Sequence, residues 1–84
     1  NVGEETMRDI VIGNNIRRAR MLADYTQQEL ADQVSVTRQT ISLIEADKYN
    51  PSLKLCLMLA HVLDKSLDDL FWIASLGENN NEMG

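Results

Sequence analysis

The sequence predicts a small, compact all-α domain of five helices, to which segments near the two chain ends add a short two-stranded ribbon. Threonine and serine are preferred N-cap residues, and they precede the later helical segments at Thr26, Thr37, Ser52 and Ser66. The 84 residues are enough for a single core. No apolar run reaches about 18 residues, so a membrane span is not expected.

Residues 9–76 are expected to form the domain. Residues 1–8 carry two glutamates and no apolar periodicity, which indicates a loose leader, and the polar residues 77–84 indicate a disordered tail. Ile10 to Ile12 form a short apolar run bounded by a glycine, which fits either a brief strand or the start of the first helix. The first helix is expected from residue 14 to about residue 23.

The next helix has a well-defined start. Thr26 is a good N-cap, and Glu29, three residues later, completes a capping box. Tyr25 and Leu30 stand at the two positions of a hydrophobic staple. The segment from Ser35 to Thr37 then predicts a short break before another helix.

Two apolar positions define the buried side of that second helix. Ile41 and Ile44 lie three residues apart on one face, and Ala31 offers a small side chain where the two helices cross. The opposite face carries polar side chains, namely Arg38, Gln39 and Ser42. This layout is typical of a helix-turn-helix and makes DNA the first candidate partner.

The chain resembles the Cro and lambda-repressor type of helix-turn-helix regulators, also called the XRE family. Matching segments occur in the family's order and spacing from about residue 12 to residue 72. They are residues 16–20, 26–45, 48–53 and 66–71. The resemblance implies a lambda-repressor-like five-helix fold and a transcriptional regulator, expected to be a repressor, that binds double-stranded DNA in a sequence-specific manner.

Three positions depart from the family pattern. Ser35 stands where the turn usually has glycine, so it must adopt a left-handed conformation, at a cost of about 1 kcal/mol, or relax the turn. Ala46 and Asp47 replace an Asn-Gly helix end, a change that aspartate tolerates better than most residues. Leu43 replaces a residue that is often polar or basic, so an apolar contact, for instance to a thymine methyl, is expected there.

The resemblance implies base contacts from the second helix of the motif. The residues concerned are Thr37, Arg38, Gln39, Ser42 and Leu43. Arginine suits the edge of guanine and glutamine that of adenine, whereas serine contacts are promiscuous. Ordinary solvated residues at a helix start are the alternative interpretation of Arg38 and Gln39.

Phosphate contacts are implied at the start of the first motif helix and after the second one. The residues concerned are Thr26, Gln27, Lys48, Tyr49 and Asn50. Arg17 and Arg18 are expected to make ordinary surface contacts or distant phosphate contacts. In the family, the residues that match Arg20 and Glu45 form an internal ion pair, so a structural role is expected for Arg20.

The net charge of −5 at first argues against a polyanionic partner. The acidic excess falls near the two chain ends, however, and residues 8–50 carry equal numbers of cationic and anionic side chains. We therefore expect specific binding with low nonspecific affinity and a modest dependence on salt.

The helix expected from Leu53 to Leu63, with Ser52 as its N-cap, is apolar on nearly all sides. A helix on the surface of a monomer would show a polar face, so a homodimer is the preferred interpretation. Its interface is expected to contain Met58, Phe71, Trp72 and Ile73. The alternative is that these side chains fill the core. Ile10 to Ile12 pairing with Trp72 to Ala74 would give the ribbon.

Catalysis is not expected, because no nucleophile–histidine arrangement or glycine-rich phosphate loop occurs. Asp68 and Asp69 are adjacent and point to different sides of a helix. The lone Cys56 and His61 do not make a zinc cluster, so no metal and no cofactor are expected. The chain shows no secretory signal pattern, which favours a cytoplasmic location.

An antitoxin or anti-regulator that acts mainly through protein–protein interaction is the alternative function. The retained Arg38, Gln39 and Lys48 argue against complete loss of DNA binding. The sequence leaves open the operator, the target genes and any small-molecule inducer.

Overall fold

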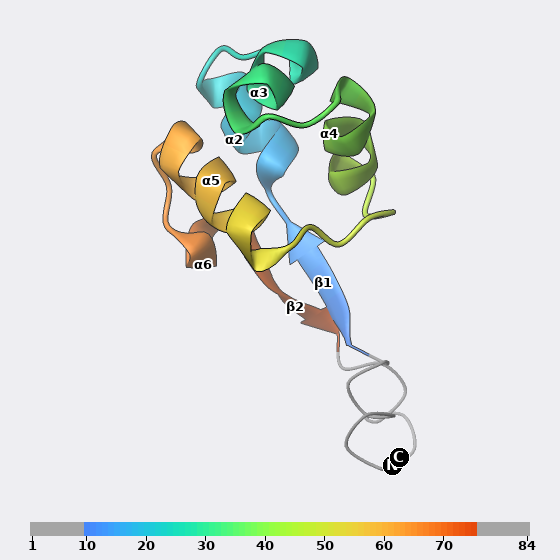
Figure 1. Cartoon of the computed structure of the whole chain (residues 1–84). Helices are drawn as coiled ribbons and strands as arrows, with labels where there is room; N and C mark the ends of the chain where they lie inside the picture. Colours follow the sequence, from blue (N-terminus) through green and yellow to red (C-terminus); the bar gives the residue numbers. More distant parts are fainter. Residues whose placement is uncertain (1–9, 76–84) are drawn as a thin grey trace, which may run out of the picture.

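The structure is a computed structural model that describes residues 10–75, and its helices form a body from which a ribbon extends (Figure 1). In chain order the elements are β1 (Val11–Asn14), α2 (Ile16–Leu22), α3 (Gln27–Val34), α4 (Arg38–Glu45), α5 (Leu53–Leu63), α6 (Leu67–Leu70) and β2 (Phe71–Ser75). The five expected helices and the two-stranded ribbon are therefore confirmed. The expected leader 1–8 and tail 77–84 lie outside the described residues.

Local side-chain chemistry fixes the helix starts. Thr26 Oγ1 accepts a hydrogen bond from Glu29 N at 3.0 Å, and Glu29 Oε1 accepts one from Thr26 N at 2.8 Å, so the expected capping box is present. Ser66 and Asp69 form the same reciprocal pair before α6. Ser52 Oγ accepts from Leu55 N at 3.2 Å and begins α5.

Residues with positive φ follow four of the helices. Ser35 takes the left-handed conformation, with φ of 61°, at the end of α3, so the turn keeps its shape without glycine. Asp47 has φ of 61° just after α4, as expected for the residue that replaces glycine there. Asp24 and Asp64 do the same after α2 and α5. Three of the four are aspartates, whose short polar side chain makes this conformation less costly than for most residues.

The ribbon extends further toward the helices than the sequence predicted. β1 and β2 are antiparallel, with Ile12 opposite Ile73, Gly13 opposite Trp72 and Asn14 opposite Phe71. The first helix was expected to begin at about residue 14, but Asn14 belongs to β1 and α2 begins at Ile16. The reason is local, because Asn14 Oδ1 accepts a hydrogen bond from Ile16 N at 3.0 Å and so ends the strand at the helix start.

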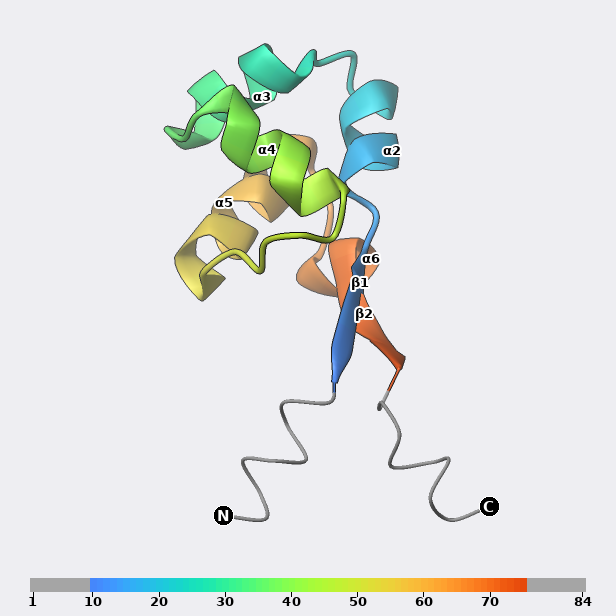
Figure 2. The same cartoon turned by 90° about the vertical axis from the view of Figure 1, so that its right-hand side faces the viewer.

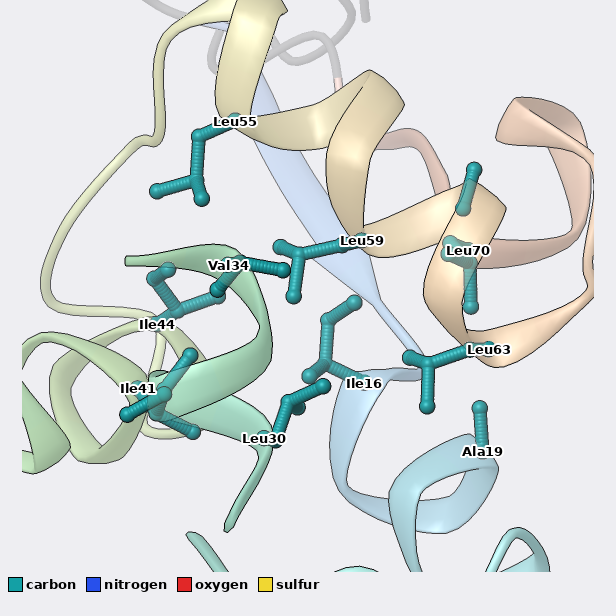
Figure 3. Packing of buried hydrophobic residues seen from close by; sticks show 12 residues of the cluster. Ile16, Ala19, Leu30, Val34, Ile41, Ile44, Leu55, Leu59, Leu63 and Leu70 are labelled. Carbon is teal, nitrogen blue, oxygen red and sulfur yellow. The ribbon is translucent and has the colours of Figure 1, made fainter. Parts of the chain in front are cut away.

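One apolar core joins all five helices (Figure 3). Its largest fully buried side chains come from α2, α3, α4, α5 and α6, and they are Ile16, Leu30, Ile41, Ile44, Leu59 and Leu70. Tyr25 packs against this core from the position expected for the staple. Within residues 10–75, no helix is long and apolar enough to cross a membrane.

Gly13 and Trp72 pack closely against each other in the ribbon. A Cβ at position 13 would lie 2.6 Å from Trp72 Nε1, so Gly13→Val should displace the indole. We expect a loss of about 1 kcal/mol in the free energy of unfolding, together with a red shift in the emission of this sole tryptophan. Urea unfolding followed by fluorescence measures both quantities.

The Trp72→Ala background is the matched control for that substitution. Without the indole, the nearest remaining neighbour of that Cβ is Ala74 Cβ at 3.3 Å, and valine has a better strand preference than glycine. The loss of stability caused by Gly13→Val, measured by circular dichroism, should therefore be smaller there. An equal loss of stability in both backgrounds would show that the indole contact is not the cause.

Candidate nucleic-acid interface

Helix α4 lies on one side of the body and is turned toward the viewer in Figure 2. Thr37 is its N-cap, and Thr37 Oγ1 accepts a hydrogen bond from Thr40 N at 3.1 Å. The same hydroxyl lies 3.0 Å from Thr40 Oγ1. The side chain of Thr37, which the sequence assigned to base contacts, therefore also holds the start of the helix.

The outer face of α4 is the side away from the core, and it carries the other expected base-contact residues. Arg38 and Gln39 are exposed, whereas Ser42 and Leu43 are half-buried one turn later. Ile41 and Ile44 are buried on the opposite side of the helix, so the core fixes which residues face outward.

The expected Arg20–Glu45 ion pair joins α2 to the last residue of α4. Arg20 Nε donates to Glu45 Oε2 at 2.7 Å, and Arg20 Nη2 donates to Glu45 Oε1 at 3.3 Å. Arg20 Nη1 donates to the carbonyl oxygen of Tyr25 at 2.9 Å. The two side chains are only 12% and 6% exposed, so each charge depends on the other for compensation.

Gln27 extends this network to the outer face of α4. Its Nε2 donates to Glu45 Oε1 at 3.0 Å, and its Oε1 accepts from Arg38 Nη1 at 3.4 Å. The sequence assigned Gln27 to a phosphate, whereas here its amide lies between an internal carboxylate and a candidate base-contact arginine. The Arg38 bond is long and exposed, so little free energy is needed to release that guanidinium.

Asn14 contacts α4 from the ribbon. Its Nδ2 donates to the carbonyl oxygen of Ile44 at 2.9 Å and to Asp47 Oδ1 at 2.8 Å. These atoms lie at the end of α4 and in the left-handed turn that follows it. Together with the contacts of Glu45, the hydrogen bonds of Asn14 fix the end of α4 that is far from Arg38.

The remaining expected phosphate contacts lie on both sides of α4. Lys48, Tyr49 and Asn50 are exposed after the helix, and Lys48 N donates to the carbonyl oxygen of Leu43 at 2.8 Å. Thr26 is exposed at the start of α3, where its hydroxyl is already used in the capping box.

A polar hollow of about 310 Å³ opens among α2, α3 and α4. Its lining residues are Arg17, Arg20, Gln27, Ser42, Glu45 and Ala46. The hollow brings the ion pair and the bridging glutamine next to a candidate base-contact serine.

The four residues assigned to a dimer interface fall into two pairs. Met58 and Phe71 are partly buried against the core, as the core-filling alternative predicts. Trp72 and Ile73 are 45% and 57% exposed on β2. Of the four residues predicted for the interface, only Trp72 and Ile73 therefore offer a largely exposed apolar surface, and both lie on the ribbon.

Two findings concern candidate metal ligands and the cysteine in the part of the chain that the structure describes. No group of three histidine, cysteine, aspartate or glutamate side chains could hold a metal ion among residues 10–75. Burial raises the pKa of the Cys56 thiol, which keeps it protonated at neutral pH and lowers its reactivity.

Two residues of this network were not identified from the sequence. Asn14 was counted only as the start of a helix, and Gln27 only as a phosphate ligand. The sequence does show that both are polar residues near a helix start. Their partners lie 30 and 18 positions away in the sequence, respectively, and no sequence signal specifies those pairings.

A family model described as Helix-turn-helix matches residues 16–70. An uncharacterized HTH-type transcriptional regulator of Archaeoglobus fulgidus is 45% identical over 56 residues, which cover 67% of this chain and 79% of the relative. The uncharacterized HTH-type transcriptional regulator YgzD of Bacillus subtilis is 37% identical over 60 residues, which cover 71% and 91%.

Two solved structures share the architecture. A chain from Bacteroides fragilis, described as a candidate DNA-binding protein, superposes with a TM-score of 0.68 at 26% identity, covering 73% of this chain and 98% of that one. A hypothetical transcription factor from Neisseria superposes with a TM-score of 0.63 at 22% identity, covering 82% and 76%. The second likeness concerns the fold alone.

Removal of the ion pair should be costly. Arg20→Ala leaves Glu45 buried with only the amide of Gln27 as a donor, so we expect a loss of about 3 kcal/mol in the free energy of unfolding. Urea titration followed by circular dichroism measures it. Arg18→Ala, at an exposed position on the same helix, should change stability by less than about 0.5 kcal/mol. Equal effects of the two substitutions would mean that the pair contributes no more than a surface charge.

Proposed function

Because the chain belongs to the XRE-type helix-turn-helix family of transcriptional regulators, we propose that it binds a near-palindromic operator in double-stranded DNA as a homodimer and represses transcription there. The observation that carries the proposal is the outer face of α4, where Arg38 and Gln39 are exposed while the far end of the helix is held by Arg20 and Asn14.

Helix α4 is proposed to enter the major groove. Its 8 residues make a rod about 12 Å long, which the groove admits. Arg38 would donate two hydrogen bonds to guanine, and Gln39 would pair with adenine. Ser42 and Leu43 would meet the next bases, with Leu43 against a thymine methyl, and Thr37 would lie at the groove edge.

Phosphate groups on either side of that groove would be held by two segments. Lys48, Tyr49 and Asn50 offer one cation and polar donors in an exposed loop. Thr26 and Gln27 begin α3, whose first backbone N–H groups suit an anion. The backbone N–H of Gln27 is the better donor here, because both side chains and the Thr26 backbone N–H are engaged in internal hydrogen bonds.

The homodimer is proposed to form through the ribbon. Trp72 and Ile73 on β2, together with Ile12 on β1, leave apolar surface in water, and large aromatic side chains are typical anchors of interfaces. Met58 and Phe71 would support this interface from the core side. Two-fold symmetry would then place the two α4 helices on half-sites about one helical turn apart.

The protein-interaction alternative has one specific observation in its favour. Leu53 and Leu57 are 66% and 52% exposed on α5. If this apolar face binds a protein partner, the chain would act as an antitoxin or anti-regulator, and tight DNA binding would require that partner.

The roles of Arg38 and Lys48 can be separated by their effects on specificity. Operators are first selected from a random duplex pool. Arg38→Ala should lose about 1 to 3 kcal/mol of binding to the selected operator and relax the preference at one base position. Electrophoretic shift titrations on the operator and on its single-base variants measure this change.

Lys48→Ala should behave differently from the arginine substitution. Loss of a phosphate-holding cation should weaken selected and random duplexes by similar factors and reduce the slope of binding against salt by about one counterion. Lys65→Ala removes an exposed cation between α5 and α6 and should change neither quantity. Identical profiles for Arg38→Ala and Lys48→Ala would reject the placement of α4 in the major groove.

The oligomeric state tests the ribbon interface. The wild-type protein should sediment as a dimer at micromolar concentration, and Ile73→Glu should shift it to the monomer because an isolated charge would be buried in the interface. Leu57→Glu introduces the same charge on α5 and should leave the dimer intact. A monomeric wild-type protein, with or without operator DNA, would rule out the proposed dimer.

A further inference from the structure

Both the oxygen and the nitrogen of the Asn14 side-chain amide make hydrogen bonds, and these bonds connect three parts of the protein. Its Oδ1 accepts from Ile16 N at 3.0 Å at the start of α2, and its Nδ2 donates to the carbonyl oxygen of Ile44 and to Asp47 Oδ1. Its backbone belongs to β1, opposite Phe71. A single side chain thus connects the ribbon, the first helix and the end of α4.

The two ends of α4 are held differently. The C-terminal end receives hydrogen bonds from Asn14 and, through Glu45, from Arg20 and Gln27. At the other end, the Arg38 side chain donates a long hydrogen bond of 3.4 Å to Gln27 Oε1. The N-terminal end of α4 is held by the Thr37 cap and by the buried Ile41, whereas the hydrogen bonds of Asn14 act on the opposite end of the helix.

Asn14 lies in the same unit as the exposed apolar residues of the ribbon. The next residue, Asn15, donates its backbone N–H to the carbonyl oxygen of Leu70 at 2.9 Å, immediately before β2. β2 then continues through Trp72 and Ile73. The hydrogen bonds of Asn14 are consequently a direct route from the proposed dimer interface to α4.

We infer that Asn14 is a positioning residue that fixes the angle of α4 relative to the ribbon and thereby sets the half-site separation that the dimer recognises. The inference rests on the proposed dimeric binding of DNA. It assigns this specificity to a side chain in the ribbon rather than to one on the outer face of α4.

The length of α4 makes the effect of a tilt on the half-site separation measurable. Tilting a helix of 8 residues by about 10° about its C-terminal end moves its N-terminal end by about 2 Å. Two protomers would together change the separation by about 4 Å, close to the rise of about 3.4 Å for one base pair. A tilt of this size would therefore correspond to about one base pair of half-site spacing.

Asp47 takes part in the same arrangement. Its left-handed backbone, with φ of 61°, ends α4 and leads into Lys48, Tyr49 and Asn50. The bond from Asn14 to its carboxylate places this turn relative to the ribbon. Base-contact and phosphate-contact groups would thus be positioned together.

The experiment uses duplexes that carry two copies of the selected half-site, with the separation changed one base pair at a time around one helical turn. The measured quantity is the ratio of affinities for the best separation and its neighbours. Asn14→Asp keeps the acceptor for Ile16 N, loses the donor to Ile44, and places a second carboxylate against Asp47. We expect the ratio to fall about fivefold or the optimum to move by about one base pair.

Two further variants and one control sharpen this test. Asn14→Asp combined with Asp47→Asn restores a donor–acceptor pair between the two positions and should recover part of the ratio. Asp47→Gly suits the positive φ, removes only the acceptor, and should change the ratio in the same direction if Asn14→Asp fails to fold. Asn15→Ala is the control. The side chain of Asn15 makes no capping hydrogen bond at the start of α2, so this substitution should leave the ratio unchanged.

The outcomes separate this inference from the function on which it rests. A wild-type protein without any preferred separation would overturn both. A wild-type protein with a sharp preference that Asn14→Asp and Asp47→Gly both retain would overturn the positioning role alone. A uniform loss of affinity at every separation would also overturn it, since that result indicates only a loss of stability.

Discussion

The Arg20–Glu45 ion pair is the interaction on which the geometry of α4 depends. Because both side chains are nearly buried, neither can turn to water without leaving the other charge uncompensated. The pair therefore fixes the last residue of α4 against α2. Gln27 donates a further hydrogen bond to the same carboxylate. Isoleucine packing determines which face of α4 is buried, and the ion pair fixes where the helix ends.

The starts of α3, α4, α5 and α6 could be predicted because their signals are local. Each of these helices has an N-cap side chain that accepts a hydrogen bond from a backbone N–H three residues later, so the sequence signal lies within four consecutive residues. The N-caps are Thr26, Thr37, Ser52 and Ser66. The break after α3 was predicted from the N-cap at Thr37, and Ser35 adopts the left-handed conformation within it. Resemblance to a known family supplied the order and the pairing of Arg20 with Glu45.

The rest of the site depends on contacts between segments far apart in the chain. The bond from Asn14 to Asp47 joins residues 33 positions apart, and nothing near either residue predicts it. Gln27 illustrates a second limit, because one amide can serve a phosphate or an internal carboxylate and the sequence does not distinguish these roles. Phe71 illustrates a third, since an apolar residue at a strand start can face the core or a partner equally well.

The ribbon also constrains when the protein can assemble during synthesis. β1 comes from the start of the described chain and β2 from its end, so Val11 meets Ser75 only after every helix between them has left the ribosome. The N-caps of α3 and α4 can form earlier, because each joins two residues only three positions apart in the chain. A nascent chain can therefore form α3 and α4 well before it completes the surface that carries Trp72, which delays any association through that surface until β2 has been synthesised.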